Sequence, residues 1–559
     1  DKFAVTPNID KLARESVRYT KAFASAPVCS PSRSCLITGC YPTSLSTQQM
    51  RSGFAIPKSM RGFPALLRAQ GFYTSNNVKT DYNTGNYADI IKASWNESSA
   101  AAHWRKRPDK AKPFFSVFNL MTSHQSRSMV WPYARFKEEV QSTLSPDAIH
   151  DPKKVPVPPY YPDTPLIRRE LARFYDCVTA MDIQVGAILK QLEEDGLAEN
   201  TIVFFYSDHG SGMPRHKRAL LDSGMHVPLI IRFPKKWQHL APGKPGSTTD
   251  RLVSFVDYAP TVLNLLGQPI PEAMQGEPFL GPNNAKPRRY VYGHRDRVDE
   301  VRDLSRSVRD ERYLYIRNYM PHLGYNQPTA WPDSGEIRHD FYRMTNKEKM
   351  TAAQWHFAGP TRPVEELYDC QADPQNLKNL AGSEAHQKTL KRLRKAHRKH
   401  ITQTVDLGFL PESEAWEMFS NKTGWELGQG GQVKMAPIHK AAAQVGMADE
   451  SVLTKNLRSK NANVRYWGAL GLAHHKALQI ETKQLLRNAL NDPSPAVRIE
   501  AANTLARAGD PKPAIRALIK DLEHENLIIV THAARTIELL GETALAAKAP
   551  MAAALKRAE

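Results

Sequence analysis

The first 290 residues alternate short apolar runs with helix-like patterns, and this alternation restricts the fold more than any other feature of the chain. It is typical of a mostly parallel sheet with helices on both faces. Apolar residues recur at helical spacing between 171 and 192 and stop before Gly196, which predicts an amphipathic helix packed on the sheet. Three runs rich in Phe, Val or Ile are too short for helices and predict buried strands: 114–120, 201–207 and 227–233. We therefore expect an α/β domain over residues 1–290.

The character of the sequence changes after this domain. Residues 291–420 contain an alternating strand pattern at 312–319 and a basic helix at 388–400, which together predict a smaller α+β subdomain. Residues 421–440 are rich in glycine and polar side chains, and they predict a linker.

The last part of the chain, residues 441–559, contains a repeat. Val464, Val497 and Val530 are each 33 residues apart, and each is followed by small residues in a helix-like pattern. This spacing resembles HEAT-type helical repeats, in which stacked helix pairs bury apolar faces that one pair cannot bury alone.

Composition and charge limit the class of protein. With 41% hydrophobic and 24% charged residues, a chain of 559 residues can bury a large core, and disorder is not expected. The net charge of +19 attracts polyanions, so nucleic acid, anionic membranes and sulfated or phosphorylated substrates begin as candidate partners. Five cysteines imply no disulfide framework, and no apolar run reaches the roughly 18 residues of a membrane span. Since the sequence opens on Asp1 without a methionine or an apolar leader, we expect any signal peptide to be removed or to lie upstream.

The segment from Val28 to Gly39 contains the most informative motif. Ser30 can cap a helix whose first position is Pro31, and Gly39 supplies a left-handed stop, so Cys29 is expected at a helix N-terminus. Free backbone N–H groups and the helix dipole favour an anion there, and Arg33 adds a fork of donors for sulfate or phosphate oxygens. The residues alone leave a second interpretation open, namely a buried structural cysteine before an ordinary helix.

A second motif, Tyr-Ser-Asp-His-Gly at 206–210, directly follows a predicted strand. Ligands of open α/β sheets bind beyond the carboxyl ends of strands, so Asp208 and His209 are expected at a site. Carboxylates are natural ligands of calcium and magnesium, whereas histidine is a less usual one. Taken alone, however, this motif is also a common turn.

Three further segments contain polar or basic residues whose roles the residues alone leave open, and a histidine near a strand end is usually a turn residue. His124 comes just after the predicted strand 114–120, and the basic residues Arg215, His216 and Lys217 follow the second motif. The segment with Arg295 and Arg297 has two interpretations: a surface salt-bridge cluster, or a site that binds carboxylates or sulfates of a sugar chain.

The Cys-x-Pro-x-Arg motif, followed by a short helix and Thr-Gly, resembles the signature of the formylglycine-dependent sulfatases of the alkaline-phosphatase-like superfamily. The preceding segment 6–23 and the later segment 366–380 also resemble this family. The resemblance implies that a separate maturation enzyme oxidises Cys29 to formylglycine, whose hydrate attacks sulfur. It also implies a divalent cation, calcium or alternatively magnesium, bound by residue 29, Asp208 and His209.

The resemblance also assigns roles to individual residues. It implies five catalytic positions: Cys29, Arg33, Lys79, His124 and Lys217. It leaves five candidates for substrate binding: Asp81, Arg215, His216, Arg295 and Arg297. Asp81 stands where the family has a histidine, so the general base is not assigned. The family also carries paired aspartates on a first strand that has no counterpart in this sequence, so we expect an N-terminally truncated form that binds metal poorly.

These features predict a hydrolase of sulfate esters or N-sulfo groups on a sulfated glycan, similar to bacterial heparan N-sulfatase-like and iduronate-sulfatase-like members. One alternative is a phosphonate or phosphate monoester hydrolase of the same superfamily. Another is an inactive protein that binds polyanions or other proteins. The resemblance implies a periplasmic or secreted location and no nucleic-acid partner, and the HEAT-like repeats are expected to bind a protein or mediate oligomerisation. The sugar, the sulfate position and exo or endo action are not predicted.

Overall fold

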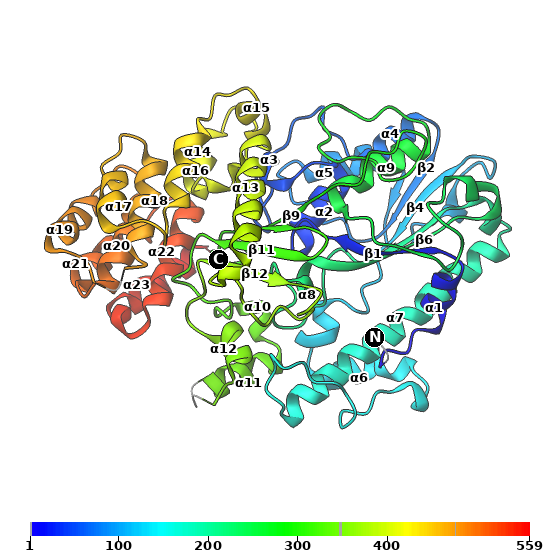
Figure 1. Cartoon of the computed structure of the whole chain (residues 1–559), viewed down its shortest axis with the longest axis horizontal. Helices are drawn as coiled ribbons and strands as arrows, with labels where there is room; N and C mark the ends of the chain where they lie inside the picture. The colour runs from blue at the N-terminus through cyan, green and yellow to red at the C-terminus, as the bar shows by residue number, and fades with distance from the viewer. Residues whose placement is uncertain (1–2, 346–348, 476, 559) are drawn as a thin grey trace.

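The computed structural model describes residues 3–345, 349–475 and 477–558. Figure 1 shows an α/β part, coloured blue to cyan and green, joined through a green antiparallel sheet to an array of helices, coloured yellow to red. All five cysteines are buried and free. None of the described helices is long and apolar enough to cross a lipid bilayer.

The α/β part contains two sheets. One has the strand order β5 (Val203–Tyr206), β6 (His226–Arg232), β1 (Val17–Phe23) and β7 (Thr248–Thr249), with β8 (Val253–Ser254) also paired to β1. The other has the order β3 (Glu97–Ser98), β2 (Tyr73–Asn77) and β4 (Phe114–Phe118), all parallel. Strands β4, β5 and β6 confirm the three strand predictions.

The prediction of a mostly parallel sheet is wrong for the first of these sheets, which is mixed. β6 is antiparallel to both β5 and β1, whereas β7 and β8 are parallel to β1. Parallel neighbours need a long crossover, usually a helix. The only α-helix described between β5 and β6 is the four-residue α8 (Asp222–Met225), which is too short for a crossover. β6 therefore pairs with β5 and runs in the opposite direction.

Strands β4 and β5 were also expected to be buried, but their side chains are only partly buried. Each lies at an edge of its sheet in the part of the chain that the structure describes, so one side of the strand has no neighbour. Apolar composition therefore predicted the strands correctly but not their position in the sheet.

Helix α7 (Pro165–Glu194) confirms the predicted amphipathic helix and extends it by one and a half turns at its N-terminus. It begins where the Thr164 side chain accepts a hydrogen bond from the Ile167 N–H, with Pro165 at the first helical position. The other helices of this part are α1 (Pro7–Arg14), α2 (Cys29–Thr38), α3 (Pro42–Leu45), α4 (Phe63–Ala69), α5 (Tyr87–Ser94), α6 (Tyr133–Glu139) and α9 (Tyr258–Leu265).

The second part is a four-stranded antiparallel sheet with the order β12 (Glu365–Asp369), β11 (Tyr313–Asn318), β10 (Ser305–Arg309) and β9 (Val291–Arg295). Helix α13 (Gln387–Gln403) packs Leu390 and Leu393 against it. The predicted strand at 312–319 and helix at 388–400 are therefore confirmed. Three short helices precede β12: α10 (Ala330–Asp333), α11 (Glu336–Thr345) and α12 (Ala352–Ala358).

The stretch 421–440, predicted as a linker, is helical and packed. It contains α15 (Gly424–Gln429) and most of α16 (Met435–Ala443), and Met435 and Ile438 are buried in the same core as the C-terminal helices. The glycines that suggested a linker lie at the start, within and at the end of α15. The stretch 421–440 has too few apolar residues for its sequence to predict burial, because most of the core around it comes from the C-terminal helices.

The helical repeats are confirmed. The described helices are α17 (Glu450–Leu457), α18 (Ala462–Leu472), α19 (Ile480–Ala489), α20 (Pro495–Arg507), α21 (Pro511–Asp521), α22 (Leu527–Leu540) and α23 (Lys548–Ala558). The three repeating valines lie near the starts of α18, α20 and α22. These helices share one core with α16 and with Phe409 of the preceding part.

Close packing of α17 against α18 makes Gly468 a sensitive position. A Cβ atom there would lie 2.5 Å from the Leu457 backbone nitrogen and 2.9 Å from the Leu453 carbonyl oxygen. We expect Gly468→Ala to destabilise the repeats by about 1–3 kcal/mol, because the added Cβ would push the backbones of α17 and α18 apart. This cost exceeds the gain from the higher helix propensity of alanine. Thermal unfolding measures this, with exposed Gln484→Ala on α19 as control. An unchanged or raised Tm in Gly468→Ala would contradict the packing argument.

Candidate active site

Helix α2 begins at Cys29, two residues before the predicted first position Pro31, and its N-cap residue is Val28. The prediction that Ser30 caps the helix is wrong: its hydroxyl donates instead to Asp81 Oδ1 at 2.7 Å. Gly39 ends the helix with φ of +68°, as predicted. Cys29 therefore lies in the first turn, where backbone N–H groups have no partner within the helix, and its side chain is buried.

Three cationic or polar side chains surround the Cys29 sulfur. Lys217 Nζ is 3.2 Å from Sγ and His209 Nε2 is 3.1 Å from it, and His124 also forms a hydrogen bond with the thiol. Burial raises the pKa of Cys29, but the charges of Lys217 and His209 and the hydrogen bonds from the two histidines outweigh burial and hold this pKa well below its ordinary value. The position therefore favours an anionic or electron-rich group.

Asp208 follows β5, at the end of the sheet where the sequence placed it. Its Oδ2 lies 3.6 Å from Arg33 Nη1 and 3.9 Å from Lys79 Nζ, and its Oδ1 lies 3.5 Å from His209 Nε2. Burial raises the pKa of this carboxyl group, but His209, Lys79 and Arg33 reverse the effect and lower it. Asp208 is therefore ionised in the centre of the cluster.

Arg33 is held in place by acceptors from two other segments. It donates to the carbonyl oxygens of Lys79 and Thr80 at 2.6 and 2.8 Å and to Asn119 Oδ1 at 2.7 Å. Asn119 is a site residue that the sequence analysis missed. It lies within the apolar run 114–120 that predicted the strand, and the signal that could have revealed it is its polar side chain in that run, directly after the observed end of β4 at Phe118.

Lys79 and Asp81 complete one side of the cluster. Lys79 Nζ lies 3.8 Å from Asp81 Oδ2, and Asp81 also accepts the Ser30 hydroxyl. Burial lowers the pKa of Lys79, but Cys29 and Asp208 outweigh it and raise this pKa. The structure thus brings together all five predicted catalytic residues, all three predicted metal ligands and Asp81.

His216 lies beside Lys217 in the sequence, but both of its ring nitrogens already have partners. Nε2 is 2.9 Å from the Tyr160 hydroxyl and Nδ1 is 2.7 Å from Ser211 Oγ. Burial, reinforced by the nearby charge of Arg215, lowers the pKa of His216 to about 3, so the ring is neutral. These contacts give His216 a structural role and leave no donor for a substrate, contrary to the prediction.

Arg215 is also buried, but part of its guanidinium is unsatisfied. Nη2 donates to the Asn376 carbonyl oxygen at 2.7 Å, and the group lies 4.4 Å from the centre of the Tyr160 ring. Nε and Nη1 have no hydrogen-bond partner among the described residues. Arg215 lines a cavity of about 30 Å³ together with Lys217, Arg218 and Arg295. Its assignment to substrate binding stays a prediction.

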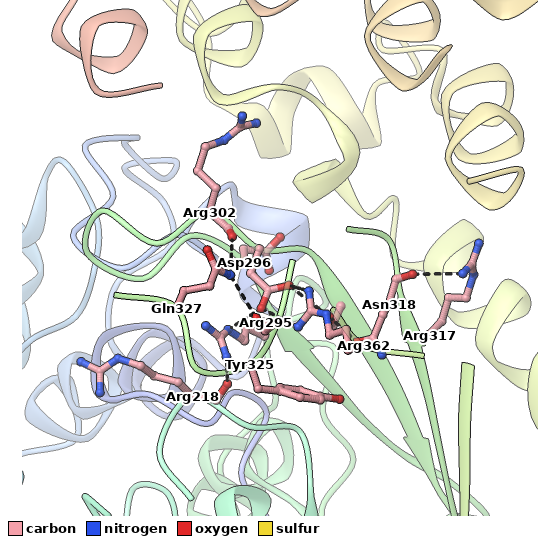
Figure 2. Close-up of polar contacts among 12 residues, drawn as sticks. Arg218, Arg295, Asp296, Arg302, Arg317, Asn318, Tyr325, Gln327 and Arg362 are labelled. Carbon is pink, nitrogen blue, oxygen red and sulfur yellow. Dashed lines mark hydrogen bonds and ion pairs between the residues drawn. The ribbon is translucent and has the colours of Figure 1, made fainter. Parts of the chain in front are cut away.

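Arg295 and Arg297 are engaged within the protein. Arg295 Nε lies 2.9 Å from Asp303 Oδ2, and Nη1 donates to the Arg218 carbonyl oxygen, as Figure 2 shows. Arg297 forms two hydrogen bonds with Glu412, of 2.6 and 2.7 Å. The salt-bridge interpretation therefore fits, with one correction: Arg295, the last residue of β9, is buried and does not lie on the surface. The alternative, that both arginines bind substrate, is not supported by these contacts.

With an oxygen in place of the Cys29 sulfur, as in a formylglycine, the donor set would fit one side of a hard divalent cation. Within the described ranges, Cys29, Asp208 and His209 have ligand atoms that all lie within 4.8 Å of one another. His209 Nδ1 is 2.6 Å from the Gly210 carbonyl oxygen, an acceptor only, so Nδ1 carries a proton and Nε2 keeps its lone pair when the ring is neutral. Calcium takes six to eight ligands, so this set is partial and further oxygens would be needed.

Comparison with known proteins agrees with this site. Residues 1–268 match the family model for sulfatases, residues 214–353 match the model for the C-terminal part of N-sulphoglucosamine sulphohydrolase, and residues 450–538 match HEAT repeats. Members of the sulfatase family generally use a formylglycine and a divalent cation.

Individual relatives extend over most of the chain. An ulvan-active sulfatase of Formosa agariphila is 38% identical over 453 residues, which cover 74% of this chain and 74% of that protein. The human N-sulphoglucosamine sulphohydrolase is 26% identical over 460 residues, which cover 72% of this chain and 86% of that protein. A crystal structure from Bacteroides thetaiotaomicron, assigned as a sulfatase, has the same fold, with a TM-score of 0.51 and 19% identity over 72% of this chain and 88% of that one. The chain therefore belongs to the sulfatase family of hydrolases.

Proposed function

We propose that this sulfatase removes sulfate from a polysaccharide of the ulvan type, with a formylglycine at residue 29 and calcium as its cation. The observation that carries the proposal is the buried position of Cys29 at the start of α2, within 3.2 Å of Lys217 and His209. The ulvan-active relative, at 38% identity, supports the substrate class, and the net charge of +19 suits a polyanionic chain.

The surroundings of Cys29 suit sulfate transfer. Formylglycine would supply the oxygen nucleophile as its hydrate, and a divalent cation held by residue 29, Asp208 and His209 would supply positive charge for the sulfate oxygens. Lys217 lies against residue 29 and would neutralise charge on the transferring group. Arg33 holds Asp208 and Lys79 in position through its ion pair with the Asp208 carboxylate and its hydrogen bond to the Lys79 carbonyl oxygen.

His124 is suited to donate a hydrogen bond on the same side. Its Nδ1 accepts a hydrogen bond from the Ser126 N–H at 3.3 Å, so in the neutral ring the proton is on Nε2. From there Nε2 can donate a hydrogen bond to residue 29 or to the leaving oxygen of the substrate, and burial lowers the pKa of His124, which favours this neutral form. Asp81 accepts a hydrogen bond from the hydroxyl of Ser30, which follows residue 29 in α2, and would complete this hydrogen-bond network.

Three further assignments rest on membership of the family. A separate maturation enzyme would oxidise Cys29, the protein would work in the periplasm or outside the cell, and Arg215 would bind an acidic group of the sugar. The HEAT repeats would contact a macromolecular partner.

The proposal is tested by hydrolysis of three substrates under identical conditions: sulfate release from ulvan oligosaccharides and from an N-sulfated heparan disaccharide, and phenol release from an aryl phosphonate. We expect the highest kcat/KM on the ulvan oligosaccharides, because the relative named for ulvan is the more similar of the two compared. Faster turnover of the heparan disaccharide would move the substrate class to N-sulfo groups. Turnover of the phosphonate alone would overturn the proposal.

A further inference from the structure

A groove of about 580 Å³ lies where the α/β part meets the helical repeats. One wall is formed by residues 51–54, another by helix α14 (Glu412–Met418), and a third by residues 525–528 at the start of α22. We call it the repeat groove. Its volume is in the range of pockets that bind small ligands, between about 300 and 1,000 Å³. Figure 1 shows α14 next to α16, at the junction with the repeat helices.

The repeat groove contains the aromatic side chain of Trp416, which is held in place by a buried phenylalanine. Trp416 is 44% exposed, and the ring of buried Phe54 packs edge-on against it at 5.4 Å between centroids. Gly53 allows the indole to lie close to the backbone, since a Cβ atom there would be 3.1 Å from the indole carbon Cζ3. A supported indole with an open surface can stack on a flat apolar face.

The opposite wall comes from the repeats. Leu527, the first residue of α22, is 59% exposed in the repeat groove. Charged groups lie around the two apolar side chains: Arg51, the Arg297–Glu412 ion pair and Glu525. A sugar ring has one apolar face and a rim of hydroxyl groups that need both donors and acceptors. The mixed, nearly neutral rim matches this chemistry better than it matches a purely anionic ligand.

Two series of contacts lead from the repeat groove toward the nucleophile, and each is completed by residues that are neighbours in the sequence. Arg51 lies 3.7 Å from Asp299, which pairs with Arg218 at 3.2 Å, next to Lys217 in the chain. On the other path, Asn83 Oδ1 accepts the backbone N–H of Ser52 in the groove wall segment, and Asp81, two residues before Asn83, bonds to Ser30.

Polar contacts between the parts hold the repeat wall in place. Arg302 donates to Glu500 at 2.6 Å and to the Tyr466 hydroxyl at 2.7 Å, and its guanidinium points away from the cluster around Arg295 in Figure 2. The Trp467 indole N–H donates to the Phe409 carbonyl oxygen at 2.9 Å. The groove is therefore built from two parts that are fixed to each other.

We propose that the repeat groove is a second carbohydrate subsite, which binds a sugar of the glycan chain other than the one that carries the reacting sulfate. The proposal rests on the proposed function and deepens it. It gives the helical repeats a direct role in substrate binding, and it makes this sulfatase an enzyme that prefers oligosaccharides to single sulfated units. Trp416 stacks on the sugar, and Leu527 closes the groove from the repeat side.

The test compares a long ulvan oligosaccharide with 4-nitrophenyl sulfate, which has no sugar to occupy the repeat groove. We expect Trp416→Ala to lower the ratio of kcat/KM on the oligosaccharide to that on the aryl sulfate by about tenfold, the loss of one stacking contact. Leu527→Asp, on the opposite wall and at a helix start that tolerates aspartate, is expected to lower the same ratio. Trp355→Ala removes an equally exposed tryptophan on α12, outside the groove, and serves as the matched control.

The outcomes separate the two proposals. A ratio that stays constant in both groove variants, whether both activities fall together or neither changes, would overturn the subsite. A wild-type protein that releases no sulfate from either substrate would overturn the proposed function, and the subsite with it. A fall of the ratio in the groove variants but not in Trp355→Ala supports the subsite.

Discussion

Replacement of Cys29 by alanine is expected to lower sulfate release by at least about 10⁴-fold, the scale on which removal of a covalent nucleophile acts. No other described side chain occupies the position between Lys217 and His209, so no residue can substitute for it. The measurement is turnover of 4-nitrophenyl sulfate by the wild type and the variant, produced together with the maturation enzyme. Peptide mass spectrometry of the wild type should find an aldehyde at residue 29 in place of the thiol.

Cys35 provides the matched control for this substitution. It lies in the same helix and is fully buried, but burial raises the pKa of its thiol, whereas the pKa of Cys29 is lowered. Cys35→Ala should therefore keep activity, although the lost packing costs about 1–2 kcal/mol of stability. Undiminished turnover by Cys29→Ala, or an unmodified thiol in fully active wild type, would rule out the nucleophile.

Local patterns predicted those parts of the molecule whose causes lie within a few residues. The strands at 114–120, 201–207 and 227–233 follow from short apolar runs, and the 33-residue spacing of valines reveals the repeats because each repeat buries the same face. The catalytic cluster was predicted through the resemblance to the sulfatase signature. For Cys29 and Asp208 the residues themselves also pointed to a site, because Cys29 lies at the start of a predicted helix and Asp208 follows a predicted strand.

Long-range pairing decided the rest. The direction of β6 depends on the short return through α8, and the start of α2 depends on Asp81, which takes the Ser30 hydroxyl that would have capped the helix. His216 looked like a substrate ligand because it precedes Lys217, but partners at Tyr160 and Ser211 occupy both nitrogens. A residue type alone does not show whether its donors are already used within the protein.

The repeat groove could not be predicted for the same reason. Trp416, Arg51 and Leu527 are far apart in the sequence, and none of them belongs to a motif. They meet only because α14 packs against both the loop at 51–54 and the first residues of α22. A surface shared by two domains carries no local signature in either of them.

Replacement of Lys217 by methionine is the second change with a large expected effect. We expect kcat/KM on 4-nitrophenyl sulfate to fall by about 10²–10³-fold, the cost of removing one preorganised cationic or hydrogen-bond donor from the reacting group. Lys217 makes no ion pair with a carboxylate among the described residues, and its side-chain hydrogen bond is to Cys29. Its buried ammonium group therefore contributes to the reaction at the expense of stability.

This leads to a result that separates catalysis from folding. Because methionine replaces a buried charge with an apolar chain of similar length, Lys217→Met should keep or raise Tm while activity falls. A lower Tm together with lower activity would instead indicate that Lys217 supports the fold. Lys106→Met, which removes an exposed lysine paired with Glu97, is the control and should leave kcat/KM unchanged. If Lys217→Met loses activity without losing stability and Lys106→Met loses neither, the Lys217 ammonium group acts directly on the reacting sulfate or on the nucleophile.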